Sequence, residues 1–257
     1  MTQLILTAGV TVFLYMIAVF GLALWRKDNS VIDVAWGLGF ILVALVSFFH
    51  DRGIEARHIL VTLLVLVWGV RLALHIYSRN RGRGEDYRYA RWRKDWGRWF
   101  LPRSFLQIFM LQGAFLLVIS YPVLLVNSST AGAPFSLDVV GTGVWLIGFF
   151  FEAWGDYQLR KFKQKAENKG KIMTAGLWKY TRHPNYFGEA VMWWGLFVIA
   201  LAVPGGWTAV ISPVLITFLL LKVSGVAMLE KKYANNSEFS AYARRTSAFF
   251  PWIPKQP

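Results

Sequence analysis

The sequence contains no cysteine and only four histidines, and each shortage removes a class of site. Without thiols the chain can form neither a disulfide bond nor a thiolate metal centre. The histidines are scattered along the chain, which argues against a metal site built from imidazoles. They stand at His50, His58, His75 and His183. We therefore expect no bound metal.

Two recognition signals are missing as well. The N-terminus, Met1-Thr2-Gln3, lacks the basic segment and the small-residue cleavage site of a signal peptide, so the first apolar run is expected to stay in the protein as a span. The glycines at positions 82, 84, 205 and 206 do not form the dinucleotide fingerprint that follows a strand. No Rossmann domain is expected.

Long apolar runs dominate what is present. Of the 257 residues, 56% are hydrophobic, whereas soluble domains average about 45–50%. The apolar residues fall in blocks of about twenty, the length that crosses a hydrocarbon core roughly 30 Å thick. The sequence therefore predicts an all-α integral membrane protein, a single domain of residues 1–257 with seven spans. These are expected at about 4–25, 31–49, 59–77, 104–126, 136–152, 190–203 and 205–227.

The positive charge lies mostly on one side of these spans. The chain carries 28 Lys and Arg, and 24 of them fall in alternate connecting segments and the C-terminal tail. The segments are 26–30, 78–103, 153–189 and 228–257. Because Lys-rich and Arg-rich loops face the cytoplasm, the N-terminus is predicted outside and the C-terminus inside. The charge is thereby explained without a nucleic-acid partner.

The densest polar cluster, residues 176–189, comes directly before the apolar run 190–203. Asn185 and Glu189 are four residues apart on one helical face, with Tyr180, Arg182 and His183 approaching from the preceding loop. An amide, a carboxylate and cations together could hydrogen-bond a carboxamide and phosphates. The alternative is structural: an interfacial turn in which the proline after His183 starts a helix at its first position. We favour the binding site.

Two further segments have the same dual interpretation. Residues 80–93 interleave arginines with aromatics and acids, which suits either a belt at the lipid headgroups or a phosphate site of guanidinium forks. Along residues 152–163, four ionisable side chains share one helical face. They are Glu152, Asp156, Arg160 and Lys163. They form either a self-paired helix end or a site that faces the bundle interior, which we favour.

Asp33, in the first turn of the second predicted span, is the remaining acidic candidate. Asn29 or Ser30 could cap this helix, with Asp33 favouring its dipole, or the carboxylate could face the bundle cavity. All these polar groups fall in the predicted cytoplasmic half, and the outer half is almost wholly apolar. The sequence thus predicts one polar pocket that opens to the cytosol beneath an apolar chamber.

Four motifs carry a resemblance to a known family. Residues 176–189 resemble the signature of the steroid 5α-reductases and sterol reductases, and look closest to their bacterial relatives, long grouped as a family of unknown function within that clan. The tail 242–252 resembles the closing motif of the reductases. Residues 156–160 resemble their Asp-Tyr-x-Leu-Arg stretch, and 80–83 match the Asn-Arg-Gly-Arg of the steroid enzymes. The similarity covers nearly the whole C-terminal half and one anchor in the N-terminal half.

This resemblance implies a seven-helix reductase that uses NADPH to reduce a carbon–carbon double bond conjugated to the ketone of a steroid or similar lipid. It implies cofactor contacts from Arg83, Asp156, Tyr180, Asn185 and Glu189. Further residues expected at the cofactor are Glu152, Arg160, Lys163, Arg182, His183, Arg244 and Arg245. Glu152 and Lys163 stand where the family has an asparagine and an arginine.

The catalytic pair of the steroid enzymes, a glutamate and a tyrosine, is not preserved. The position aligned with the tyrosine falls near Trp68, so a protonated Asp33 or the phenol of Tyr87 is the predicted donor to the ketone oxygen. Trp36 and Tyr89 are expected to contact substrate. Residues 1–103 would then hold substrate and proton donor, and residues 104–257 the cofactor.

Two other functions remain open. Membrane methyltransferases of the isoprenylcysteine type share an Arg-His-Pro-x-Tyr-x-Gly stretch but bind S-adenosylmethionine, which has no phosphate for the many basic residues to neutralise. A lipid-binding protein without enzymatic activity is the third possibility. The reductase hypothesis also predicts a monomer in the lipid bilayer, in the inner membrane of a bacterium, with its active site facing the cytoplasm.

Overall fold

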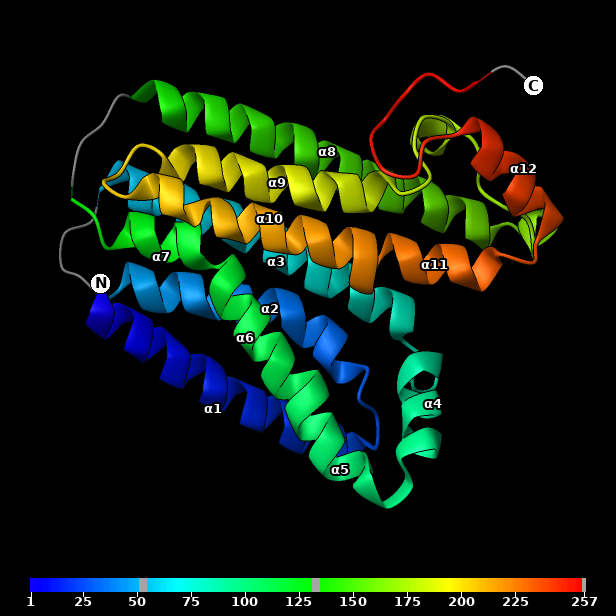
Figure 1. Ribbon diagram of the computed structural model, residues 1–257, viewed down its shortest axis with the longest axis horizontal. Coiled ribbons are helices and arrows are strands. Elements are labelled where there is room, and N and C mark those ends of the chain that lie inside the picture. The colour runs from blue at the N-terminus through cyan, green and yellow to red at the C-terminus, as the bar shows by residue number, and fades with distance from the viewer. Residues whose placement is uncertain (51–54, 131–134, 256–257) are drawn as a thin grey trace. The chain divides into compact units, whose positions relative to one another are not determined.

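The computed structural model describes residues 1–50, 55–130 and 135–255, and every regular secondary-structure element among them is a helix (Figure 1). The chain divides into two compact units, which are described separately below. Unit 1 comprises Met1–Ala133 and Val203–Ala209, and unit 2 comprises Pro134–Ala202 and Val210–Pro257. The single polar pocket predicted from the sequence would need residues of both units, and it stays a prediction.

Six helical stretches are long and apolar enough to cross a membrane by length and composition. They are Thr2–Arg26, Val31–Phe48, Ala56–Asn80, Tyr87–Ile119, Phe135–Gln164 and Gly206–Tyr233. The expectation of an all-helical, multi-pass membrane protein is confirmed for the described residues. The predicted sixth span corresponds to α9 (Pro184–Ala200), whose 17 residues make a helix about 25 Å long. Neither a seventh span nor the orientation of the termini is established.

Unit 1 contains α1 (Thr2–Arg26), α2 (Val31–Phe48) and α3 (Ala56–Asn80), which are its three longest helices. After α3 follow α4 (Tyr87–Trp96), α5 (Phe100–Arg103), a π-helical segment (Ser104–Met110), α6 (Leu111–Ile119) and α7 (Tyr121–Asn127). The helical stretch Tyr87–Ile119 begins before the predicted span 104–126, because it also includes α4 and α5.

The packing of α2 on α3 depends on two glycines that face each other. A Cβ on Gly37 would stand 2.7 Å from the carbonyl oxygen of Gly69, and one on Gly69 would stand 2.7 Å from that of Gly37. Only glycine allows two helix backbones to approach this closely. Beside this contact, Phe40 packs edge-on against Trp36 and Trp68, with ring centroids 5.1 and 5.2 Å apart.

Unit 2 is built around two long helices, α8 (Phe135–Gln164) and α9. The rest of the unit consists of α10 (Ile211–Phe218), a π-helical segment (Leu219–Val223), α11 (Val226–Tyr233) and α12 (Ser237–Arg245). Short 3-10 turns at Ala166–Asn168 and Gly176–Lys179 lie between α8 and α9.

A stripe of glycines brings α8 and α9 into backbone contact. Gly141 and Gly148 on α8 are seven residues apart, as are Gly188 and Gly195 on α9. A Cβ on Gly148 would lie 2.6 Å from the carbonyl oxygen of Gly188, and one on Gly195 would lie 2.7 Å from that of Gly141. Each glycine therefore faces the backbone of the other helix, and this register determines which polar residues meet farther along.

We expect Gly148→Ala to destabilise the protein by about 1–3 kcal/mol, because the added methyl group would force the two helices apart. Gly143→Ala is the matched control, since Gly143 lies on the same helix, a Cβ there would meet no atom within 4 Å, and the change improves helix propensity. The measurement is the thermal unfolding midpoint in detergent. Equal midpoints for the two variants would contradict the close-packing interpretation.

Candidate functional site

Four of the predicted cofactor residues lie on α8 and α9, in the part where these two helices pack together. Asp156 and Asn185 are joined by a hydrogen bond from the Asn185 amide Nδ2 to Asp156 Oδ1 at 3.1 Å. One turn away, a Cβ on Gly188, next to Glu189, would lie 3.0 Å from the Cα of Glu152. The three acidic side chains are all buried, between 2% and 9% exposed. The structure thus brings together residues that lie about 30 positions apart in sequence.

Asn185 leaves one polar atom without a partner. Its side-chain oxygen Oδ1 is buried and accepts no hydrogen bond within the part of the chain that the structure describes. A buried acceptor without a donor costs free energy, so such an atom marks a place where a ligand or water can bind. Asn185 Oδ1 is therefore an acceptor for a ligand that carries an N–H or O–H group.

The basic residues of α8 lie beyond this cluster. Arg160 follows Asp156 by one helical turn, and both Arg160 and Lys163 are exposed near the C-terminal end of the helix. Tyr180, in the loop before α9, is 43% exposed. These positions suit contact with a charged ligand from solvent, and the roles predicted for all three stay predictions.

Arg182 has a different environment from the one expected of a phosphate ligand. Its buried guanidinium donates through Nε and Nη2 to Glu230 Oε1, at 2.9 and 2.5 Å, and through Nη1 to the carbonyl oxygens of Ala243 and Thr246. These contacts join the start of α9 to α11 and to the end of α12. Because protein oxygens occupy its donors, Arg182 is a positioning residue in this structure.

His183 lies beside this ion pair at the N-cap of α9. Its imidazole is buried, stacks on the ring of Tyr186 at 5.6 Å, and places Nε2 3.6 Å from Glu230 Oε1. Neither ring nitrogen forms a hydrogen bond with any described residue. The structural alternative for this stretch is correct in one respect, because the helix does begin at Pro184.

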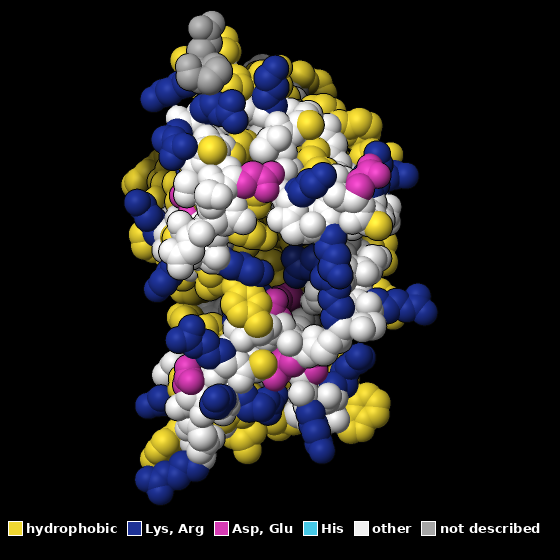
Figure 2. Space-filling view, turned by 90° about the vertical axis from the view of Figure 1, so that its right-hand side faces the viewer, with side chains coloured by type: hydrophobic (Ala, Val, Ile, Leu, Met, Phe, Trp, Pro, Cys, Tyr) yellow, Lys and Arg dark blue, Asp and Glu magenta, His cyan; other side chains and the backbone are white. Residues whose placement is uncertain are grey.

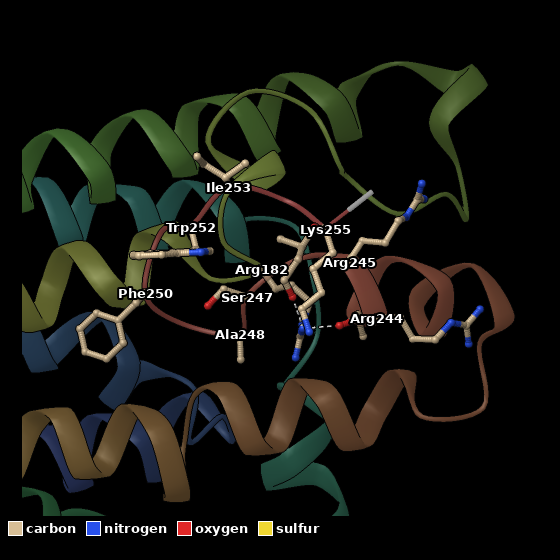
Figure 3. Close-up of a pocket in the computed structure, with 11 residues that line it drawn as sticks. Arg182, Arg244, Arg245, Ser247, Ala248, Phe250, Trp252, Ile253 and Lys255 are labelled. Atoms are coloured by element: carbon tan, nitrogen blue, oxygen red, sulfur yellow. Dashed lines mark hydrogen bonds between the residues drawn. The ribbon is translucent and has the colours of Figure 1, made fainter. Parts of the chain in front are cut away.

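The C-terminal segment is fastened along the loop that precedes α9. The backbone N–H of Arg182 donates to Ser247 O at 2.9 Å, and that of Trp252 donates to Tyr180 O at 2.9 Å. The Tyr242 hydroxyl donates to Trp178 O, and burial raises the pKa of that phenol. The Arg244 and Arg245 side chains stay exposed, and in Figure 3 they extend away from Arg182.

The polar cluster of unit 1 is centred on Asp33. Its Oδ1 accepts a hydrogen bond from the Tyr89 hydroxyl at 2.6 Å, and its Oδ2 accepts one from Arg88 Nη2 at 2.8 Å. Tyr89 is buried, whereas Tyr87 is 52% exposed. Both oxygens of Asp33 accept hydrogen bonds in this structure, and its predicted role as proton donor stays a prediction.

The capping interpretation is correct in position, because Ser30 is the N-cap residue of α2 and Asp33 lies in its first turn, but no side-chain hydrogen bond caps the helix. Ser30 Oγ instead accepts from the backbone N–H of Asp86 at 2.7 Å, and Asn29 Nδ2 donates to Ser104 Oγ at 3.1 Å. Burial opposes ionisation of Asp86, but hydrogen bonds from the side chain and backbone of Arg88 outweigh it and lower the pKa of that carboxyl. Arg88 therefore pairs with two carboxylates.

Sequence reasoning missed Arg88 and Glu230 as partners of Asp33 and Arg182. The pairs are separated by 55 and 48 residues, and no periodic pattern connects them. Arg83 is exposed and Trp36 is half-buried, so their predicted roles at cofactor and substrate stay predictions. Among the described residues, no group of three or more His, Asp or Glu could hold a metal ion.

The chain is an all-helical, multi-pass membrane protein, and its sequence matches a protein family over most of its length. Residues 19–246 match a family model described as "Protein of unknown function (DUF1295)". The chain therefore belongs to this family, which is part of the steroid 5-alpha-reductase-like group.

Individual relatives are more distant. An uncharacterized protein of Schizosaccharomyces pombe, C594.04c, is 25% identical over 206 residues, which cover 69% of this chain and 59% of the relative. The bovine 3-oxo-5-alpha-steroid 4-dehydrogenase 1 is 34% identical over 67 residues, 26% of each chain. The rat enzyme of the same name is 25% identical over 117 residues, 45% of this chain and 41% of the relative. No solved structure matches.

We expect Glu230→Gln to loosen the C-terminal segment, because the buried Arg182 would lose its charged partner. The amide of Trp252, which bonds Tyr180, should then exchange with solvent at least tenfold faster, corresponding to about 1.4 kcal/mol. Hydrogen exchange followed by mass spectrometry measures this. Glu167→Gln is the control, since its ion pair with Lys165 is exposed. Unchanged exchange in the Glu230 variant would refute the proposed coupling.

We expect Asp33→Asn to destabilise unit 1 by roughly 1–3 kcal/mol, because Arg88 loses a charged acceptor in a mostly buried site. Thermal unfolding in detergent checks this. The control is Asp95→Asn, whose pair with Arg91 is largely exposed and should contribute at most about 1 kcal/mol. A smaller effect at position 33 than at position 95 would argue against the Asp33 contacts as a stabilising centre.

Proposed function

We propose that this protein is an NADPH-dependent reductase that saturates a carbon–carbon double bond conjugated to a ketone, in a steroid or similar lipid enone. The observation that carries the proposal is the buried cluster between α8 and α9, in a chain that belongs to a 5α-reductase-like family. There the buried Asn185 oxygen has no hydrogen-bond partner among the described residues, and the two helices also carry the buried Glu152, Asp156 and Glu189.

The chemistry of this cluster fits the carboxamide of a nicotinamide. That group needs acceptors for its N–H bonds, and Asn185 Oδ1 is a buried acceptor without a donor. Asp156 holds the Asn185 side chain through its amide nitrogen, which orients the free oxygen. Buried carboxylates also favour a ligand that gains positive charge during the reaction, as a nicotinamide does when it gives up a hydride.

The phosphates of a dinucleotide require cations, and exposed basic side chains could approach them from solvent. Arg160 and Lys163 at the end of α8, and Arg83 after α3, have the solvent exposure that such contacts need. S-adenosylmethionine carries no phosphate, so these residues favour the reductase over a methyltransferase. We assign Arg182 to positioning, since its donors already hold Glu230 and the C-terminal segment.

When bound, NADPH would supply the hydride for the β-carbon of the enone, and a proton would be added at the α-carbon. The ketone oxygen gains negative charge as the hydride arrives, so a hydrogen-bond donor at that oxygen acts mainly in the transition state. We propose the exposed phenol of Tyr87 for this task. Asp33 would stabilise α4 through Arg88 and Tyr89, and Trp36 would offer apolar surface to the substrate.

We further propose the topology expected from the charge distribution. In it α9 also crosses the membrane, which brings the number of spans to seven, the N-terminus lies outside, and the predicted cofactor residues face the cytoplasm. A helix of about 25 Å can cross a hydrocarbon core of roughly 30 Å if the bilayer thins locally or the flanking residues are buried in protein. A monomer in a bacterial inner membrane remains part of this hypothesis.

Ligand-induced thermal stabilisation of the purified protein tests the function. We expect NADPH to raise the unfolding midpoint and S-adenosylmethionine to leave it unchanged, because only a ligand of the native state shifts it. Added 3-oxo-Δ4 steroid should then cause loss of the NADPH absorbance band. A shift with S-adenosylmethionine alone would favour the methyltransferase, and a shift with neither ligand, together with no NADPH oxidation by any enone, would reject the reductase.

The Asn185→Ala variant tests the observation on which the proposal rests, the buried Asn185 oxygen without a partner. Loss of the buried acceptor should weaken NADPH binding about tenfold, the equivalent of one hydrogen bond at about 1.4 kcal/mol. Asn235→Ala, at an exposed position in the same unit, is the matched control and should bind NADPH as the unaltered protein does. Equal affinity of both variants would remove Asn185 from the cofactor site.

A further inference from the structure

The C-terminal segment of unit 2 forms one side of an open pocket with a volume of about 370 Å³ (Figure 3). Its exposed lining is of two chemical kinds. Arg244, Arg245 and Lys255 are basic, and Phe250, Trp252 and Ile253 are large and apolar. The segment is fastened by its backbone to residues 180–182, so these side chains are presented from a defined position.

The three basic side chains are available to a ligand. All are exposed, and none forms an ion pair or a side-chain hydrogen bond with any described residue. Arg182, which also borders the pocket, differs from them because Glu230 neutralises it and carbonyl oxygens occupy its donors. The pocket therefore presents three positive charges without acidic partners, which suits an anion.

The apolar side chains point to the source of that anion. Phe250, Trp252 and Ile253 are 66%, 73% and 78% exposed. Tryptophan and phenylalanine beside basic residues are typical of protein surfaces at the membrane–water interface. In Figure 3, Trp252 and Phe250 lie on one side of Arg182, and the Arg244 and Arg245 side chains extend on the other. Figure 2 shows further Lys and Arg side chains exposed on the face that it views.

We propose that this pocket binds the phosphate headgroup of an anionic phospholipid from the bilayer that the chain spans. The basic side chains contact the phosphate, and the apolar side chains enter the interfacial region. A free phosphate would use the charges but leave the three apolar side chains exposed to water. This assignment gives Arg244 and Arg245 a ligand other than the cofactor, and it does not depend on the proposed reductase activity.

Titration of the full-length protein in detergent with dihexanoyl phosphatidylglycerol, followed by thermal unfolding, tests the proposal. The lipid should raise the midpoint, whereas dihexanoyl phosphatidylcholine and inorganic phosphate should not. The variant Arg244→Gln/Arg245→Gln/Lys255→Gln should bind phosphatidylglycerol about a hundredfold more weakly, since each basic residue near a membrane surface contributes about fivefold. Trp252→Ser should also weaken lipid binding.

The matched control is Lys165→Gln/Lys169→Gln/Lys171→Gln, which removes the same charge from exposed positions of unit 2 outside the pocket. It should retain lipid affinity. Equal losses in the two triple variants, or equal binding of both lipids, would overturn the proposal, as would equal stabilisation by inorganic phosphate. If Arg244→Gln/Arg245→Gln/Lys255→Gln instead loses stabilisation by NADPH and keeps lipid binding, the pocket belongs to the cofactor. Absence of NADPH stabilisation in all forms would reject only the reductase.

Discussion

The backbone contact between α8 and α9 is the constraint on which the rest of unit 2 depends. Each glycine of the stripe faces a carbonyl oxygen of the other helix, so the two helices can neither slide nor separate without losing the fit. This register places Asp156 against Asn185 and the backbone of Glu152 against Gly188. The candidate cofactor cluster is therefore a consequence of glycine packing a few turns away.

A second fastening completes the unit at its polar end. Arg182 and Glu230 connect the start of α9 with α11, and the carbonyl oxygens of Ala243 and Thr246 extend the connection to the end of α12. Backbone hydrogen bonds then hold the segment that follows. Charged groups in these positions orient neighbouring helices. The presence of Arg182 in a recognisable motif therefore does not by itself make it a ligand-binding residue.

Unit 1 uses its charges in a similar way. Asp33 contacts Arg88 and Tyr89, and Ser30 contacts the backbone of Asp86, so the first turn of α2 is joined to the start of α4. The acidic and hydroxyl side chains that suggested a cap or a proton donor are occupied in holding these elements. Tyr87, close to them in sequence, remains exposed, which is why its phenol is the better candidate for contact with a substrate.

The sequence by itself determined the helical class, the multi-pass membrane character and the family, because apolar run length and contiguous motifs are local properties of the chain. It also placed Asp156, Asn185 and Glu189 correctly on helical faces, since helical periodicity follows from spacing. Only the tertiary structure decided which faces meet and which charges pair. Packing pairs Arg182 with Glu230 and Asp33 with Arg88 across about 50 residues. The spacing of residues along the sequence does not predict such pairs.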